Sequence, residues 1–189
     1  KIVDQDGSAM VSVDLELNNS SKKLIETQVR MVIKPKNFPG DEVWDKVRDI
    51  QLQPGRNTIK LVQTIQKPEL WWTWDHGKPN LYTAEFTIGE PGTYDALVET
   101  FGIKKIEQDA KGLWYLNGKR LFIRGMRYLS SLWMSEIGEK QYREDLGKML
   151  DMHINSIRIG SHVEHPVFYD LCDEMGLLLW QVFPLHYCY

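Results

Sequence analysis

The chain has 189 residues, of which 42% are hydrophobic and 26% charged, and its formal net charge is -3. This composition is ordinary for a globular protein, and it offers no basic surface for nucleic acid. No hydrophobic stretch approaches the roughly 20 residues that cross a bilayer, so we expect neither a nucleic-acid nor a membrane partner. The length suits one large domain or two smaller ones.

The start of the chain and its cysteines say little about the compartment. The sequence opens at Lys1 without an initiator Met or a signal peptide, which we interpret as a cut inside a longer protein. Cys172 and Cys188 are too few for a disulfide framework or a metal site. Two free thiols are the simpler interpretation, although a pair is left open. We predict no cofactor.

Residues 1–103 show the pattern of a β-sandwich. Hydrophobic and polar residues alternate from Val11 to Leu17, which is the period-two signature of a half-buried strand. Turn residues such as Pro54-Gly55 separate the strands that follow. These strands are predicted at 27–33, 50–52, 59–65, 82–88 and 98–103. About six or seven short strands with frequent turns are typical of an immunoglobulin-like sandwich.

Residues 104–189 have a different rhythm. Asn117-Gly118 joins two apolar runs, 113–116 and 120–123, and predicts a hairpin with a type I′ turn. Hydrophobic residues at helical spacing then predict one helix over 142–153 and a second from Pro166 to Gly176.

Short apolar runs at 155–159 and 177–180 alternate with these helices. The order strand, helix, strand, helix, strand predicts parallel strands joined by right-handed crossovers. Because such a short sheet leaves an open edge, we expect it to be an incomplete part of a larger domain.

Several segments resemble family 2 glycoside hydrolases. Leu116–Gly125 is similar to the segment that opens the family's (β/α)8 barrel, and Asn155–Arg158 resembles the motif of its second strand. Residues 168–177 are similar to the helix before the third strand. Trp180-Gln181 looks like the β-mannosidase and exo-β-glucosaminidase branch. Upstream, Trp71–Trp74 and Pro79–Tyr82 resemble part of the family's sandwich domain. The fold class implied is an all-β immunoglobulin-like sandwich followed by an incomplete (β/α)8-barrel segment.

The resemblance implies retaining hydrolysis of β-linked sugars, with two carboxyl groups about 5 Å apart. In the family both are glutamates, on the fourth and seventh barrel strands. No Asp or Glu of this chain matches either position, so we predict no catalytic residue here and no activity of the chain alone. Arg127-Tyr128-Leu129, which we place after the first barrel strand, and Val182 depart from the better-known branches. The sugar therefore stays open among mannoside, glucosaminide and galactoside types.

Four residues are predicted to bind substrate. The family counterpart of Arg158 holds the nucleophile carboxylate; the alternative is a structural ion pair. At the end of the third strand, Trp180 would stack on a sugar and Gln181 would bond its hydroxyls, unless the tryptophan is barrel core. His162 would line the pocket. The His-x-Glu-His spacing at 162–165 is weak support for a metal, and we predict none. The implied partners are a β-linked oligosaccharide and the rest of the parent chain.

An alternative from another class is a non-catalytic sandwich module that binds carbohydrate or a partner protein. It would use the flat faces of Trp71, Trp72 and Trp74. The competing interpretation is that these tryptophans have a packing role between domains, which is common for so large a side chain.

Overall fold

The computed structural model describes residues 2–3, 7–89, 95–131, 133–160 and 162–184. The chain divides into two compact units. Unit 1 comprises residues 1–69 and 81–103, and unit 2 comprises residues 70–80 and 104–189. The segment 70–80 therefore belongs to unit 2, although strands of unit 1 flank it in the sequence.

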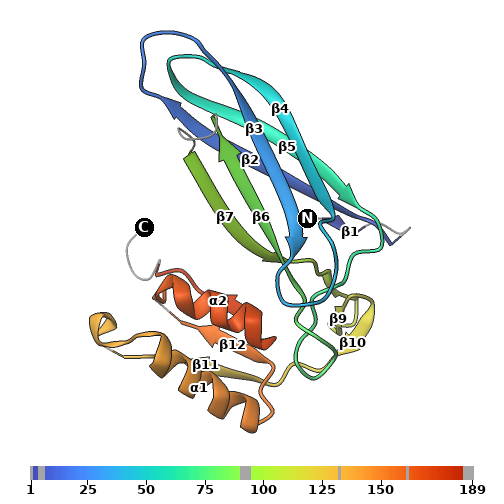
Figure 1. Ribbon diagram of the computed structural model, residues 1–189. Coiled ribbons are helices and arrows are strands. Elements are labelled where there is room, and N and C mark those ends of the chain that lie inside the picture. Colours follow the sequence, from blue (N-terminus) through green and yellow to red (C-terminus); the bar gives the residue numbers. More distant parts are fainter. Residues whose placement is uncertain (1, 4–6, 90–94, 132, 161, 185–189) are drawn as a thin grey trace. The chain divides into compact units, whose positions relative to one another are not determined.

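The described residues of unit 1 form two antiparallel sheets, with strand orders β1-β2-β5 and β4-β3-β6-β7 (Figure 1). The strands are β1 (Ile2–Val3), β2 (Ala9–Asn19), β3 (Ile25–Pro35), β4 (Trp44–Leu52), β5 (Gly55–Ile65), β6 (Leu81–Ile88) and β7 (Asp95–Gly102). The predicted sandwich is thereby confirmed, and its core contains Val11, Leu15, Met31, Ile33 and Phe86.

β4 is longer than the short strand predicted at 50–52. It pairs with β3 from Ile33↔Trp44 to Ile25↔Leu52 and forms the outer strand of its sheet. Residues 45–49 are exposed on both faces. A polar edge strand has no alternation of burial, and the sequence pattern therefore missed this half.

The described residues of unit 2 form two small sheets, two helices and one 3-10 turn. An antiparallel sheet has the order β10-β9-β8, and a parallel sheet has the order β11-β12-β13. The elements are β8 (Ile106–Gln108), β9 (Trp114–Leu116), β10 (Lys119–Leu121), β11 (Gly125–Tyr128), η1 (Met134–Glu136), α1 (Glu139–Asp151), β12 (Ser156–Ile159), α2 (Pro166–Met175) and β13 (Leu178–Gln181). The strand–helix alternation confirms the predicted barrel segment.

Local chemistry explains the turns of unit 2. Asn117 and Gly118 have φ of 50° and 78°, as a type I′ turn requires, and β9 and β10 pair directly around them. Pro166 begins α2, and Gly176 ends it in the left-handed conformation.

Two boundaries differ from the prediction. Helix α1 ends at Asp151, and His153 follows with φ of 59°. The first parallel strand, β11, includes Arg127 and Tyr128, which we had placed after it.

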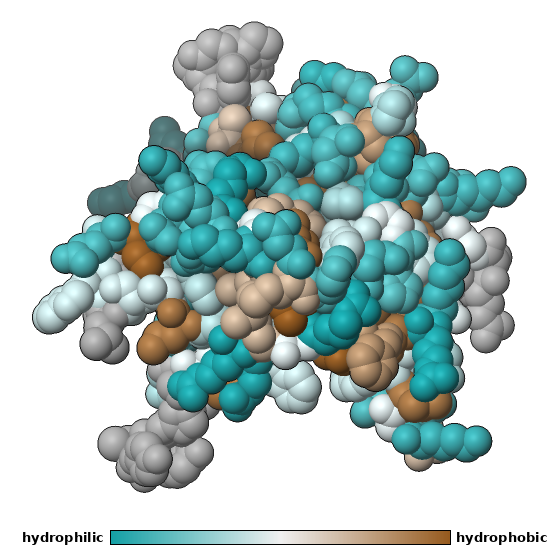
Figure 2. Space-filling view, turned by 90° about the horizontal axis from the view of Figure 1, so that it is seen from below, coloured by the Kyte–Doolittle hydropathy of each residue, from teal (hydrophilic) through white to brown (hydrophobic). Residues whose placement is uncertain are grey.

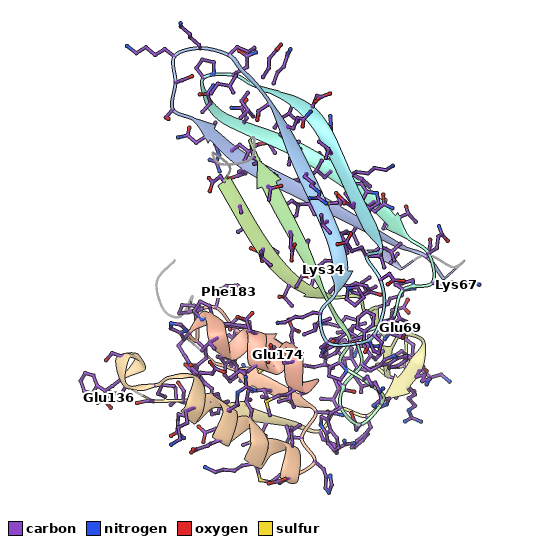
Figure 3. The ribbon with its side chains drawn as sticks, viewed as in Figure 1. Lys34, Lys67, Glu69, Glu136, Glu174 and Phe183 are labelled. Atoms are coloured by element: carbon purple, nitrogen blue, oxygen red, sulfur yellow. The ribbon has the colours of Figure 1, made fainter. Side chains whose placement is uncertain are left out.

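The core of unit 2 lies between the parallel sheet and its helices. Tyr142 and Leu146 of α1, Phe168 of α2, and Ile157 and Ile159 of β12 are all buried there. Tyr128 stacks on Phe168 with ring centroids 5.3 Å apart. At the surface, Arg143 of α1 pairs at 3.6 Å with Glu174 of α2, which Figure 3 labels. Among the described residues, both α-helices of unit 2 pack against this one face of β11-β12-β13.

The described surface is mixed. Figure 2 shows a mainly hydrophilic face with hydrophobic residues in small separate patches. Within the described ranges, no helix has both the length and the apolar character that crossing a bilayer requires.

Candidate functional site

Three of the side chains at the carboxyl edge of the parallel sheet share one face. The register pairs Arg127 with Arg158, and Arg158 with Trp180. Their neighbours along the strands, such as Ile157 and Ile159, point into the helix-covered core. Because successive side chains of a strand alternate, this row points away from the helices. All three residues are exposed, Trp180 at 59% and the next aromatic along the chain, Phe183, at 63% (Figure 3).

His162 lies in the loop after β12, and both of its ring nitrogens contact oxygen atoms. Nδ1 lies 2.9 Å from the carbonyl oxygen of Gly160, and Nε2 forms a short contact with Oε1 of Glu164. A carbonyl only accepts hydrogen bonds, so Nδ1 is the donor in the first contact. Both contacts are satisfied when His162 carries two protons, or when Glu164 carries one.

Glu164 is the centre of this loop. Its carboxylate is buried and accepts hydrogen bonds from Tyr142 (2.7 Å) and Ser130 (2.8 Å) as well as the contact from His162. Burial alone raises the pKa of Glu164, but the hydrogen bonds from His162, Tyr142 and Ser130 outweigh it, and the pKa falls below its ordinary value. Burial and Glu164 together raise the pKa of Tyr142 to about 12.

Gln181 connects this loop to β13 and α2. Its Nε2 donates to the carbonyl oxygen of His162 at 2.7 Å, and its Oε1 accepts from the hydroxyl of Tyr169 at 2.7 Å. That hydroxyl in turn accepts from the backbone N–H of Glu164 at 3.1 Å. The amide of Gln181 thus holds the loop in place and lies on the opposite side of β13 from Trp180.

Sequence reasoning missed Glu164, Tyr169 and Arg127 as members of this edge. Glu164 was visible only as part of a weak His-x-Glu-His spacing, and Arg127 only as a departure from the family pattern. In the parts of the chain that the structure describes, no cluster of three or more His, Cys, Asp or Glu side chains suits a metal ion. Cys172 is a buried free thiol whose pKa is raised by burial, and Cys188 lies outside the described residues.

Asn155, the first residue of the Asn155–Arg158 motif, lies at the opposite end of β12 from the site. It is fully buried; its Oδ1 accepts from the backbone N–H of Arg124 at 2.8 Å, and its Nδ2 donates to Asp75 at 3.1 Å. Arg124 also donates to Asp75 at 2.6 Å. Burial raises the pKa of Asp75, but hydrogen bonds from Thr73, His76, Arg124 and Asn155 outweigh it and hold the pKa well below its usual range. This network stabilises the amino ends of the strands.

The tryptophans of segment 70–80 are part of the same structural end. Nε1 of Trp71 donates to the carbonyl of Asp173 at 2.8 Å, and Nε1 of Trp74 donates to that of Ile154 at 2.7 Å. Trp71 is fully buried. Trp72 lies between Gly77 and the ammonium group of Lys119, which is 4.7 Å from the ring. These contacts favour the packing role over a carbohydrate-binding platform.

The architecture defines a class of protein: an antiparallel sandwich joined to parallel strand–helix units of the (β/α)8 type. Within that class, the chain belongs to glycosyl hydrolases family 2. The family model matches residues 1–104, and the model of the family's TIM barrel domain matches residues 107–183.

Individual relatives agree with this assignment. The chain is 30% identical over 177 residues to an exo-beta-D-glucosaminidase of Hypocrea jecorina, covering 90% of this chain and 19% of the relative. It is 40% identical over 126 residues to a mannosylglycoprotein endo-beta-mannosidase of Lilium longiflorum, covering 62% and 13%. The chain thus spans a fifth or less of the length of these curated relatives.

Solved structures share the fold. A putative beta-galactosidase from Bacteroides fragilis aligns with a TM-score of 0.86 at 23% identity, covering 95% of this chain and 27% of that one. A beta-D-mannosidase from Dictyoglomus thermophilum aligns with a TM-score of 0.81 at 27% identity, covering 92% and 22%.

Proposed function

We propose that this chain is part of a retaining β-glycoside hydrolase and forms one wall of its glycoside-binding site. The observation that carries the proposal is the row of Arg127, Arg158 and Trp180 at the carboxyl edge of the parallel sheet. Active sites of (β/α)8 enzymes are built at this edge. Membership of glycosyl hydrolases family 2 supports the reaction type.

In this proposal, the two catalytic glutamates lie outside the chain. Glu164 is the buried carboxylate closest in sequence to the edge, and both of its oxygens already accept contacts from Ser130, Tyr142 and His162. A carboxylate held in this way is a poor nucleophile towards a sugar. We therefore assign Glu164 a structural role and expect the chain alone to be inactive.

Three of the predicted residues would contact the substrate in the proposed site. Gln181 was predicted to bond sugar hydroxyls, but both ends of its amide are bonded within the protein, so we now assign it a positioning role. Arg158 is exposed and would hold the nucleophile carboxylate through its planar guanidinium group. Trp180 would stack on the sugar, because flat aromatic faces pack against sugar rings. Gln181 fixes the loop through the carbonyl oxygen of His162, and His162 would then line the pocket.

The test compares two proteins on aryl β-mannosides, β-glucosaminides, β-glucuronides and β-galactosides. The 189-residue chain should release no aryl alcohol above a buffer blank. A longer polypeptide that continues through the remaining barrel strands should hydrolyse at least one substrate, with the β-anomer as first product by NMR. Turnover by the chain alone would refute the placement of the glutamates. An α-anomer as first product would refute the retaining mechanism.

A further inference from the structure

The two carboxylate oxygens of Glu164 contact different parts of the carboxyl edge. Oε2 accepts from the hydroxyl of Ser130, in the loop after β11, at 2.8 Å. The hydroxyl of Tyr142, on α1, donates to the same oxygen at 2.7 Å. Oε1 forms the short contact with Nε2 of His162, in the loop after β12. The side chain of Glu164 is fully buried, so one enclosed carboxylate joins the loop after β11 to the loop after β12.

The backbone of Glu164 is fixed as well. Its N–H donates to the hydroxyl of Tyr169 at 3.1 Å, and that hydroxyl donates to Oε1 of Gln181 at 2.7 Å. Gln181 in turn donates to the carbonyl oxygen of His162 at 2.7 Å. All of these partners belong to the described residues, so the network needs no group from the rest of a longer polypeptide. Members of one hydrogen-bond network respond together when one of them is removed.

We propose that Glu164 is a positioning residue that couples the loop after β11 to His162. The inference rests on the proposed function, in which both loops border the glycoside-binding site, because each follows the carboxyl end of a barrel strand. Removing the hydroxyl of Ser130 takes a donor from Oε2. The orientation of the carboxylate then changes, and with it the contact that holds the ring of His162. Bonds to a charged acceptor are strong, so this coupling reaches turnover as well as stability.

The kinetic experiment uses the longer polypeptide that continues through the remaining barrel strands, with an aryl β-glycoside that it hydrolyses. Ser130→Ala should lower kcat/KM by about fivefold or more, and Ser130→Thr, which keeps the hydroxyl, should stay within about twofold of the parent. Ser131→Ala is the matched control from the same loop. Its hydroxyl accepts from the backbone N–H of Trp133 at 2.9 Å, and its loss should change kcat/KM by less than about twofold.

A double-mutant cycle separates positioning from a general loss of stability. In the Ser130→Ala, His162→Gln double variant, kcat/KM should exceed the value expected from multiplying the two single effects by about threefold or more. The reason is that Ser130 has nothing left to position once the imidazole is gone. The same cycle with Ser131→Ala should be multiplicative. All assays are run well below the unfolding midpoint of each variant, so that the rates report folded protein.

A second measurement uses the 189-residue chain and requires no hydrolysis. In NMR spectra, the ring signals of His162 should shift in Ser130→Ala and stay in place in Ser131→Ala. Unmoved signals in Ser130→Ala, or multiplicative effects of Ser130→Ala and His162→Gln, would overturn the inference. If the longer polypeptide hydrolyses no glycoside, the proposed function fails, and the signals of His162 still decide whether Glu164 couples the two loops.

Discussion

Gly176 packs directly against the backbone of Trp74. A Cβ at residue 176 would come within 2.6 Å of the backbone nitrogen of Trp74, whose N–H donates to the carbonyl oxygen of Gly176 at 3.1 Å. The same glycine ends α2 with φ of 74°. One residue thus stops a helix and admits segment 70–80 to unit 2, and both tasks require the absence of a side chain.

Gly176→Ala should therefore be strongly destabilising. The left-handed conformation costs alanine about 1 kcal/mol, and the clash with backbone atoms of Trp74 adds to it, so we expect a loss of about 3 kcal/mol in the free energy of unfolding. Urea unfolding followed by circular dichroism measures this. Gly147→Ala is the matched control: it lies inside α1 with open space around it and should stabilise by about 0.5–1 kcal/mol. Similar effects of both changes would contradict the explanation.

Trp71→Phe should lower stability through a single hydrogen bond. The phenyl ring keeps much of the buried apolar surface, but the carbonyl of Asp173 loses its donor at 2.8 Å. We expect a cost of about 1–3 kcal/mol in unfolding by urea. Trp133→Phe, at an exposed position, should change stability by less than about 0.5 kcal/mol. A Trp71→Phe variant as stable as the control would show that the indole N–H is not part of the fold's stability.

The features that were predicted correctly depend on residues close together in the sequence. The type I′ turn at Asn117-Gly118 and the end of α2 at Gly176 follow from residues that tolerate positive φ. Strand β2 was predicted from its alternating hydrophobic and polar residues, which is the pattern of a half-buried strand. These features are determined by residues a few positions apart. The polar half of β4 was not predicted, because its residues are exposed on both faces and hydrophobic and polar side chains do not alternate there.

The missed features depend on residues far apart in the chain. Segment 70–80 joins unit 2 through two long-range hydrogen bonds. Trp71 donates to a carbonyl 102 residues away in sequence, and Trp74 donates to one 80 residues away. No periodicity encodes such a contact. For the candidate site, the motifs pointed to Arg158, Trp180, Gln181 and His162, whose roles in substrate binding stay predictions. The link from Gln181 through Tyr169 to the Glu164 loop exists only in the folded arrangement.

Asp75 should make the stability of unit 2 depend on pH. Its folded pKa is depressed by its hydrogen-bond donors. Its stabilisation is therefore complete above the unfolded value of about 4 and is lost as pH falls through the folded value. At pH 7, Asp75→Asn should cost about 2 kcal/mol or more, because the bonds to Arg124 and Asn155 are charge-assisted. Between about pH 4 and 2 the difference between parent and variant should shrink. A difference independent of pH would show that the charge is not involved.

Glu164→Gln should disrupt the loop that carries His162. An amide oxygen can keep Tyr142 and Ser130, and its NH2 can donate to Nε2 of a neutral His162, but the negative charge that strengthens all three contacts is lost. We expect a loss of about 2 kcal/mol or more in urea unfolding at pH 7. The loss should diminish in acid, because the depressed pKa of Glu164 places its stabilisation above about pH 4.

Glu144→Gln is the matched control for this change. Glu144 is exposed on α1, and its replacement should leave the free energy of unfolding within about 0.5 kcal/mol of the parent. In NMR spectra, the ring signals of His162 should shift in Glu164→Gln and stay in place in Glu144→Gln. Unchanged His162 signals in Glu164→Gln would show that Glu164 does not position this histidine, whatever the loss of stability.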